Sequence, residues 1–465
     1  MLRDLLSREL LADGGGARAR VRDHRFSRFH RCGLLEVGSV ADGSQVAELV
    51  TAGGSVFALT SCGVCVGFDA ASGRRLCVLN RRGEREAIVS LVHNELNASL
   101  VVVSALSEDG FASSSCTAHA LDALRSGCTE RGMALFARES FVSGGFVEFS
   151  QESGTAVTLD GESGRFKVWG MAAPERPLFA LTEEGGEPVF DVRLAPETLL
   201  VIHHSPLDDP DAIPLSLLDA TTGETVLRFE HRCGGKPLHL WQSAEKLFVQ
   251  EEGAPLAIAD MRTWDAATRR CARTRHCSLQ PGPDDHIITL HRSRQLLAFF
   301  RRGAAVWSFE GEHLRTLDDH AVCGHVFGEL SLAAAVVTAA EDATIALCED
   351  GPRAGRPVGA GSLHISHVAS GRCAARVDWC GADDVALCSL AYDDERGEIV
   401  AGGDDGNVRV WRAGGDSVDP RCVTPPVTAA PAPPSARRRA RALLTTTPRT
   451  QPGGPRHAHA PAASA

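Results

Sequence analysis

The chain has 465 residues, of which 43% are hydrophobic and 23% are charged, a composition that excludes a fibrous or wholly disordered protein. Its net charge of −11 is unevenly spread along the chain. Residues 1–32 contain eight Arg and four acids, and residues 413–465 contain seven Arg and two Asp. The remaining 33 basic and 53 acidic groups give residues 33–412 a net charge of −20. Since an acidic body repels phosphate backbones, nucleic-acid binding through residues 33–412 is disfavoured.

Residues 1–32 are predicted to be a basic N-terminal extension. Its leucines have a spacing that places them on one face of a short helix ending near Gly14: Leu2, Leu5, Leu6 and Leu10. This face could dock a partner or pack on the protein's own body.

Targeting and membrane signals are weak in this sequence. The N-terminus alternates leucines with charged residues, so it lacks the apolar core of a secretory signal, and its acids argue against an import peptide. The longest strongly apolar stretch, Leu330 to Ala340, is about half of the ~20 residues that cross a bilayer. The sequence therefore predicts no membrane partner and an intracellular location, cytoplasmic or nuclear.

From Gln45 to Arg412 the chain repeats one pattern: a short apolar run, a turn rich in Gly, Asp or Ser, and another run with period-two alternation. This pattern predicts strands and hairpins. Three turns of one kind recur at 68–73, 218–223 and 366–371, each ending in a glycine. A polar side chain is expected to cap each turn while the glycine takes a positive φ.

Each such turn is expected to follow the third strand of a four-stranded unit. The candidate third strands are Val64–Asp69, Ser115–Leu121, Arg165–Trp169, Pro214–Asp219, Leu256–Asp260, Ala304–Phe309, Ser362–His367 and Asn407–Trp411. Units that repeat every ~40–60 residues predict an all-β propeller over residues 33–412. The count favours eight blades, with seven as the alternative because Leu91–Arg125 and Val322–Val377 are irregular.

The last unit supplies only three strands before the pattern ends at Gly414: Leu387–Tyr392, Glu398–Gly402 and Asn407–Trp411. A lone strand, Leu34–Val40, precedes the first complete unit. We expect it to complete the last blade, because a ring closed in this way has no unpaired edge.

Residues 398–411 resemble the core of a WD40 repeat through Gly402, Asp405, Gly406 and Trp411. Weaker echoes lie at 159–169 and 305–320, and Asp342 is a second candidate turn aspartate. The resemblance implies a WD40-like propeller. At three strand-ending tryptophans the family's Trp-Asp pair is missing, because these tryptophans precede Gly170, Ser308 and Arg412. The family's internal hydrogen-bond networks are therefore expected to be incomplete.

The candidate metal or redox motifs favour structural roles. Cys62 and Cys65 have the spacing of a zinc half-site, but no second half-site lies at a suitable separation. The odd total of fifteen cysteines over a long chain predicts mostly reduced thiols. Adjacent His203 and His204 face opposite sides of a strand, and His457 lies with His459 in the C-terminal tail. We therefore expect no metal and no cofactor.

Catalytic motifs are also missing from the sequence. The acidic clusters 208–211, 284–285 and 393–395 lie in loops, where solvated acids are ordinary turn formers. No nucleophile elbow, Walker loop or dinucleotide fingerprint occurs. The sequence therefore predicts a protein that is not an enzyme.

Residues 413–465 are rich in Pro, Ala, Thr and Arg and are predicted to be a disordered tail. They hold a basic cluster of Arg437, Arg438, Arg439 and Arg441. Three interpretations stay open for it: nuclear import, docking on the acidic body, or a solvated charge run. Thr447, before Pro448, is a candidate phosphorylation site.

The WD40 resemblance implies a non-catalytic scaffold that binds proteins, and the charge favours basic peptide segments over nucleic acid as partners. No small-molecule partner is expected. One alternative is a substrate receptor of a ubiquitin ligase, although Trp264-Asp265 lacks the adaptor signature's Arg and Trp411-Arg412 lacks its Asp. The other is a propeller enzyme with a ligand in a central channel lined by Val189–Leu194 and Leu387–Ala391.

Overall fold

The computed structural model describes residues 29–413. The segments within that range that it does not describe are 38–43, 81–85, 109–110, 131, 137–140, 161–162, 182–187, 207–208, 210, 266, 269, 274–276, 283–284, 301–302, 318–330, 350–360 and 380–384. The chain divides into two compact units, Met1–Thr424 and Pro425–Ala465. The predicted N-terminal helix, the basic arginine cluster and all of the predicted tail except Ala413 lie outside the described residues.

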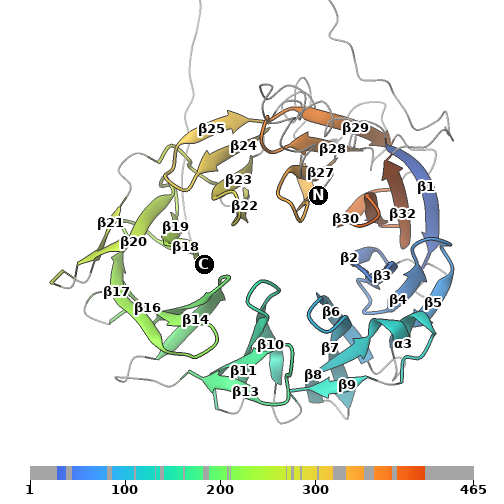
Figure 1. Cartoon of the computed structure of the whole chain (residues 1–465), viewed down its shortest axis with the longest axis horizontal. Helices are drawn as coiled ribbons and strands as arrows, with labels where there is room; N and C mark the ends of the chain where they lie inside the picture. Colours follow the sequence, from blue (N-terminus) through green and yellow to red (C-terminus); the bar gives the residue numbers. More distant parts are fainter. Residues whose placement is uncertain are drawn as a thin grey trace, which may run out of the picture. The chain divides into compact units, whose positions relative to one another are not determined.

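Within the first unit, the described residues form eight antiparallel blades arranged in a ring (Figure 1). We number the blades along the chain. Blade 1 contains β2 (Val46–Ala52), β3 (Ser55–Thr60), β4 (Cys65–Asp69) and β5 (Arg75–Val78). Blade 2 contains β6 (Glu86–Asn94), β7 (Ser99–Glu108), β8 (Phe111–Ala120) and β9 (Met133–Leu135), with the short helix α3 (Leu121–Arg125) after β8.

The next three blades follow the same order. Blade 3 contains β10 (Phe141–Ser150), β11 (Thr155–Asp160), β12 (Phe166–Gly170) and β13 (Pro177–Ala180). Blade 4 contains β14 (Val189–Leu194), β15 (Thr198–His203), β16 (Ala212–Asp219) and β17 (Thr225–Arg232). Blade 5 contains β18 (Pro237–Ser243), β19 (Lys246–Glu251), β20 (Ala257–Asp265) and β21 (Arg270–Arg273).

The last three blades complete the ring. Blade 6 contains β22 (His286–Leu290), β23 (Gln295–Phe300), β24 (Gly303–Ser308) and β25 (His313–Thr316). Blade 7 contains β26 (Ser331–Val337), β27 (Ala343–Glu349), β28 (Gly361–His367) and β29 (Cys373–Trp379). Blade 8 contains β30 (Leu387–Asp393), β31 (Glu398–Gly403), β32 (Asn407–Ala413) and β1 (Phe29–Glu36).

The eight-blade prediction is confirmed and the seven-blade alternative is wrong. Every predicted third strand overlaps an observed one: β4, β8, β12, β16, β20, β24, β28 and β32. The irregularity at Leu91–Arg125 reflects two unusually long strands, β7 and β8, followed by α3. Backbone pairing of Phe141 with Ser114 also joins blades 2 and 3 into one extended sheet.

The ring closes through β1, which pairs antiparallel with β32 as predicted. The strand spans Phe29–Glu36, however, whereas Leu34–Val40 was expected, so Phe29–Cys32 belong to a blade and not to an extension. Phe29 is buried at 4% exposure and joins the core between blades 7 and 8. The polar residues His30 and Arg31 interrupt the apolar pattern there, so the sequence did not indicate that the strand begins at Phe29.

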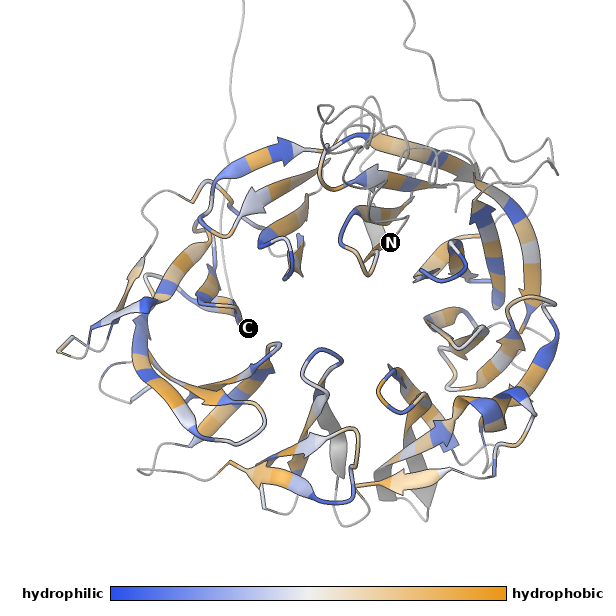
Figure 2. Ribbon diagram, viewed as in Figure 1, coloured by the Kyte–Doolittle hydropathy of each residue, from blue (hydrophilic) through white to orange (hydrophobic). Residues whose placement is uncertain are grey.

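The core lies in the seams between neighbouring blades, because each blade presents an apolar face to the next. One cluster joins Leu35, Val56 and Val408 between blades 8 and 1, and another joins Leu215, Phe229 and Val249 between blades 4 and 5. Figure 2 shows hydrophobic and hydrophilic bands alternating along the outer strands. This alternation places one set of side chains in a seam and exposes the other.

Polar side chains also link the inner strands of adjacent blades. The Glu48 carboxylate accepts hydrogen bonds from Leu91 N at 3.2 Å and Ser90 Oγ at 3.3 Å. Similar links run from Leu194 N to Glu148 Oε2, from Trp241 Nε1 to Thr289 Oγ1, and from Ser389 Oγ to the carbonyl oxygen of Val46. Burial raises the pKa of Glu48 and of Glu148 more than these hydrogen bonds lower it, so the pKa of each carboxyl lies above its ordinary value.

Candidate functional site in the seam between blades 3 and 4

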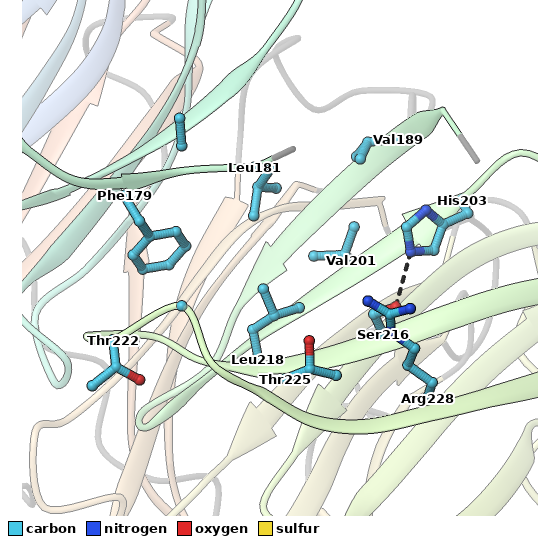
Figure 3. A pocket seen from close by; sticks show the side chains of 12 residues that line it. Phe179, Leu181, Val189, Val201, His203, Ser216, Leu218, Thr222, Thr225 and Arg228 are labelled. Carbon is cyan, nitrogen blue, oxygen red and sulfur yellow. Dashed lines mark hydrogen bonds between the residues drawn. The ribbon is translucent and has the colours of Figure 1, made fainter. Parts of the chain in front are cut away.

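The seam between blades 3 and 4, here called the 3/4 seam, has an apolar interior. Its buried residues come from both blades: Val157, Phe166, Val168, Leu181, Val192, Leu199, Val201 and Leu218. The outer part of this seam is not filled by side chains. It forms a pocket of about 120 Å³, which we call the seam pocket (Figure 3).

Blade 4 provides most of the lining through the register of its strands. Val201 pairs with Ser216 and Ser216 pairs with Arg228, so these three side chains lie side by side on the face toward blade 3. Blade 3 provides the opposite wall through Phe179, Ala180 and Leu181, at the end of β13. Figure 3 shows Leu181, Val189, Val201 and Leu218 converging as an apolar floor.

Polar groups line one side of this floor. His203 Nε2 and Ser216 Oγ share a hydrogen bond of 2.9 Å (Figure 3). Thr222, Thr225 and Arg228 are exposed and stand at the mouth. No carboxylate and no thiol occurs among the described residues that line the seam pocket, so they offer no acid pair for hydrolysis and no sulfur ligand for a metal.

The turn between β16 and β17 forms an edge of the pocket and requires a glycine at 223. Gly223 has φ +74°, and a Cβ there would lie 2.7 Å from Phe179 Cγ. The Asp219 carboxylate caps the turn by accepting hydrogen bonds from the N–H groups of Thr221 and Thr222 and from the Thr221 hydroxyl. These bonds lower the pKa of Asp219 to about 2. The expected capping and positive φ are therefore both present in this turn; positive φ also occurs at Gly73 and Gly371, and Asp69 caps the Gly73 turn by accepting from Ser72 N.

Exposed apolar side chains lie on the strands that carry the pocket residues. Leu178 is 47% exposed on β13, Val226 is 61% exposed on β17, and Phe190 is 62% exposed beside Val189 on β14. The Phe190 ring meets His204 edge-on, with 5.1 Å between ring centroids. His203 and His204 thus have different partners, and they do not converge on one ion.

The residues that carry the WD40 resemblance lie at the closure of the ring and not at the seam pocket. A Cβ on Gly402 would lie 2.5 Å from Val46 Cβ, and Gly406 has φ +76° in the turn before β32. Asp405 binds the Arg409 guanidinium through two hydrogen bonds of 2.9 and 3.0 Å, and Trp411 is 2% exposed in the core. Burial raises the pKa of Asp405, but the bonds from Arg409 and Asn407 outweigh it and leave that pKa below its ordinary value.

The other sequence candidates occupy separate structural environments. Cys65 is fully buried in β4, whereas Cys62 is exposed in the preceding turn, so the two thiols do not face one centre. Asp342 accepts a hydrogen bond of 2.7 Å from Thr338 Oγ1.

Each acidic loop cluster has members bonded within or between turns. Asp285 accepts from Gly282 N, Asp393 from Arg396 N and Asp394 from Ala339 N. Asp209 pairs with Arg232. Asp208 and Asp284 lie outside the described residues. These contacts give the described carboxylates a role in shaping loops.

The chain belongs to a family of domains of unknown function. The model of that family, DUF7899, matches residues 27–411. This range starts close to β1 and ends within β32, so it includes the strand pair that closes the ring. The WD40 assignment stays a prediction.

No curated protein matches this chain. Among solved structures, the chain is similar to the computationally designed Ika8 protein, with 15% identity and a TM-score of 0.48, over 80% of this chain and 96% of that chain. It is also similar to BamB from Moraxella catarrhalis, with 16% identity and a TM-score of 0.41, over 83% of this chain and 98% of that chain. Among the described residues, no helix has the length and apolar character needed to span a membrane.

The seam pocket was not found by sequence reasoning. Its walls come from β13 and from the strands of blade 4, and none of its residues forms a recognisable motif. Two signals were available: the 218–223 turn, which was identified as a structural turn and not as the edge of a site, and His203, which was considered only as a metal ligand.

Proposed function

We propose that this protein is a non-catalytic scaffold that binds a peptide segment of a partner protein at the seam pocket. One observation carries the proposal: an apolar floor is open to solvent, and the strands that line it also carry exposed apolar side chains at Leu178, Phe190 and Val226. Exposed apolar groups beside a preformed pocket are typical of recognition sites.

The size of the seam pocket favours one side chain over a whole metabolite. Small-molecule sites usually enclose roughly 300–1,000 Å³, whereas a cavity of ~150 Å³ holds one benzene molecule. At about 120 Å³, the seam pocket suits a single aliphatic or small aromatic anchor. An anchor residue buried in such a pocket is the common basis of an interface hot spot.

Charge then suggests how the rest of the partner segment is composed. The net charge of −20 on residues 33–412 attracts basic segments over long range. The described lining of the pocket includes Arg228 and His203 and no carboxylate. We therefore propose an apolar anchor in the pocket, with any basic residues of the partner lying outside it.

A peptide-display selection on the full chain tests this proposal. Ala180→Trp places a large side chain at the pocket wall from an exposed position, and Thr268→Trp makes the same change at an exposed position of blade 5. Peptides selected on the unmodified protein should share an apolar residue. Their affinity should fall by at least about thirtyfold, ~2 kcal/mol, in Ala180→Trp and stay unchanged in Thr268→Trp.

Two results would contradict the proposal. Peptides that bind Ala180→Trp as well as the unmodified protein would show that the seam pocket is not the docking site. A reproducible rise in unfolding temperature with a metabolite, lost in Ala180→Trp, would favour a small-molecule site instead.

A further inference from the structure

Three side chains with metal-binding atoms meet in the next seam, between blades 4 and 5, here called the 4/5 seam. His231 lies near the end of β17, Cys233 follows it by two residues, and Glu251 ends β19. A ring nitrogen of His231, Sγ of Cys233 and a carboxylate oxygen of Glu251 all lie within 4.8 Å of one another. One nitrogen, one sulfur and one oxygen donor therefore face a common centre.

The fold explains why these residues converge. Residues at i and i+2 of an extended chain share a face, which places Cys233 on the same side as His231. His231 shares its face of β17 with Phe229, whose ring packs in the core between blades 4 and 5. Glu251 pairs with Pro237 at the beginning of β18, so the connection from blade 4 into blade 5 passes beside the carboxylate.

Backbone groups hold the carboxylate in a fixed orientation. Glu251 Oε2 accepts hydrogen bonds of 2.8 Å from Gly234 N and from Gly235 N, and its side chain is buried at 4% exposure, as is that of His231. Hydrogen bonds behind a ligand orient it for a metal ion. Two N–H groups offset part of the cost of burying a carboxylate, and a bound cation would offset more.

Two of the three residues, His231 and Cys233, line a cavity of about 300 Å³ together with Ala259 and Cys271. Three protein ligands beside an open space leave a fourth coordination position for water or an exogenous ligand. Ca²⁺ and Mg²⁺ take oxygen ligands, whereas Zn²⁺ accepts nitrogen, sulfur and oxygen together. The donor set therefore selects a borderline ion over a hard one.

We propose that His231, Cys233 and Glu251 bind one Zn²⁺-like divalent ion that connects blades 4 and 5. Binding would draw the end of β17 and the end of β19 to one centre. It would therefore stabilise the 4/5 seam, and this proposal does not depend on the peptide site in the 3/4 seam.

Cobalt titration of the full chain tests the site, after treatment with a chelator and with no added purification tag. Co²⁺ bound through a thiolate gives a near-ultraviolet charge-transfer band. We expect this band to saturate at one equivalent, to disappear on adding Zn²⁺ and to be absent in Cys233→Ser. Cys271→Ser, which removes the other thiol of the cavity, should keep the band.

A second pair of variants separates ligation from folding. Glu251→Gln keeps an oxygen that can accept hydrogen bonds from Gly234 N and Gly235 N but removes the negative charge. This variant should weaken Co²⁺ binding by at least about tenfold, because even the loss of an outer-shell partner costs about 10–100-fold in metal affinity. Replacing both tail histidines, His457 and His459, by alanine should leave binding unchanged. Metal-free Glu251→Gln should show the circular dichroism spectrum of the metal-free unmodified protein.

Three results would overturn the proposal. The first is the absence of a thiolate band at saturating Co²⁺, and the second is an equal band in Cys233→Ser. The third is loss of binding in the tail-histidine variant alone, which would place the ion outside the 4/5 seam.

Discussion

Leu35 in β1 is the register partner of Val408 in β32, so one hydrogen-bonded strand pair joins the two ends of the described chain. Both side chains are buried, and both belong to the core between blades 8 and 1. Among the described strands, the ring is therefore closed by the first in sequence, which pairs with the last. This arrangement leaves β32 without a free edge.

Replacing Leu35 by alanine tests how much the closure contributes to stability. Leu35 is 3% exposed, so Leu35→Ala should lower the free energy of unfolding by ~2–5 kcal/mol. Its neighbour Leu34 is 43% exposed, and Leu34→Ala should change the free energy of unfolding by less than about 0.5 kcal/mol. Urea unfolding followed by circular dichroism measures both, and equal losses would show that β1 does not seal the ring.

Gly402→Ala should destabilise the protein through a steric conflict at the contact between blades 8 and 1. The new Cβ would lie 2.5 Å from Val46 Cβ and from Ser389 Oγ, which forces a backbone shift costing ~1–3 kcal/mol. Gly33→Ala is the matched control, because the nearest atom to its Cβ lies 3.9 Å away. A thermal melt in which the two variants behave alike would contradict the close approach at Gly402.

Glu398 holds two arginines at the closing blade and should make stability depend on acid pH. The carboxylate is 1% exposed and accepts hydrogen bonds from Arg396 at 2.8 Å and from Arg412 at 2.7 Å. Burial raises the pKa of Glu398, but the bonds from both arginines outweigh it and leave the pKa below its ordinary value of 4.5.

The sign of this effect follows from linkage. A lowered pKa in the folded state means that the stabilisation is complete above about pH 4.5 and is lost as the pH falls toward the folded-state pKa. Glu398→Gln should cost ~3–5 kcal/mol at neutral pH, because it leaves two partly buried guanidinium groups without their carboxylate. Its unfolding free energy should also fall less steeply below pH 4.5 than that of the unmodified protein, and parallel curves would contradict this role.

Cys62 and Cys32 are both exposed thiols, yet they should react at different rates. Burial raises the pKa of Cys62, but hydrogen bonds with Ser44 and Thr60 outweigh it and lower that pKa, whereas burial raises the pKa of Cys32. Since the thiolate is the reactive form, iodoacetamide at neutral pH should label Cys62 before Cys32. Peptide mass mapping against time measures the order, with buried Cys65 as the unreactive reference, and faster labelling of Cys32 would refute it.

Much of the fold could be predicted because its signals are local. Side-chain alternation along 212–219 and the glycine at 223 specify a strand and a turn without reference to the rest of the molecule. The same reasoning located the third strand of every blade and the strand that closes the ring. Sequence reasoning misplaced the start of β1, because Phe29 pairs with Ala413 and no local pattern indicates a partner almost four hundred residues away.

The candidate sites depended on the tertiary structure. Phe179 meets Gly223 in the 3/4 seam, and His231 meets Glu251 in the 4/5 seam, because consecutive blades pack face to face. Strand periodicity states which side chains share a face, but not which residue of the next blade lies opposite them. By itself, the sequence determined the repeat, the turns and an acidic body. Only the packing of one blade on the next decided where a pocket stays open and where three ligands meet, because those distances depend on how the whole ring closes.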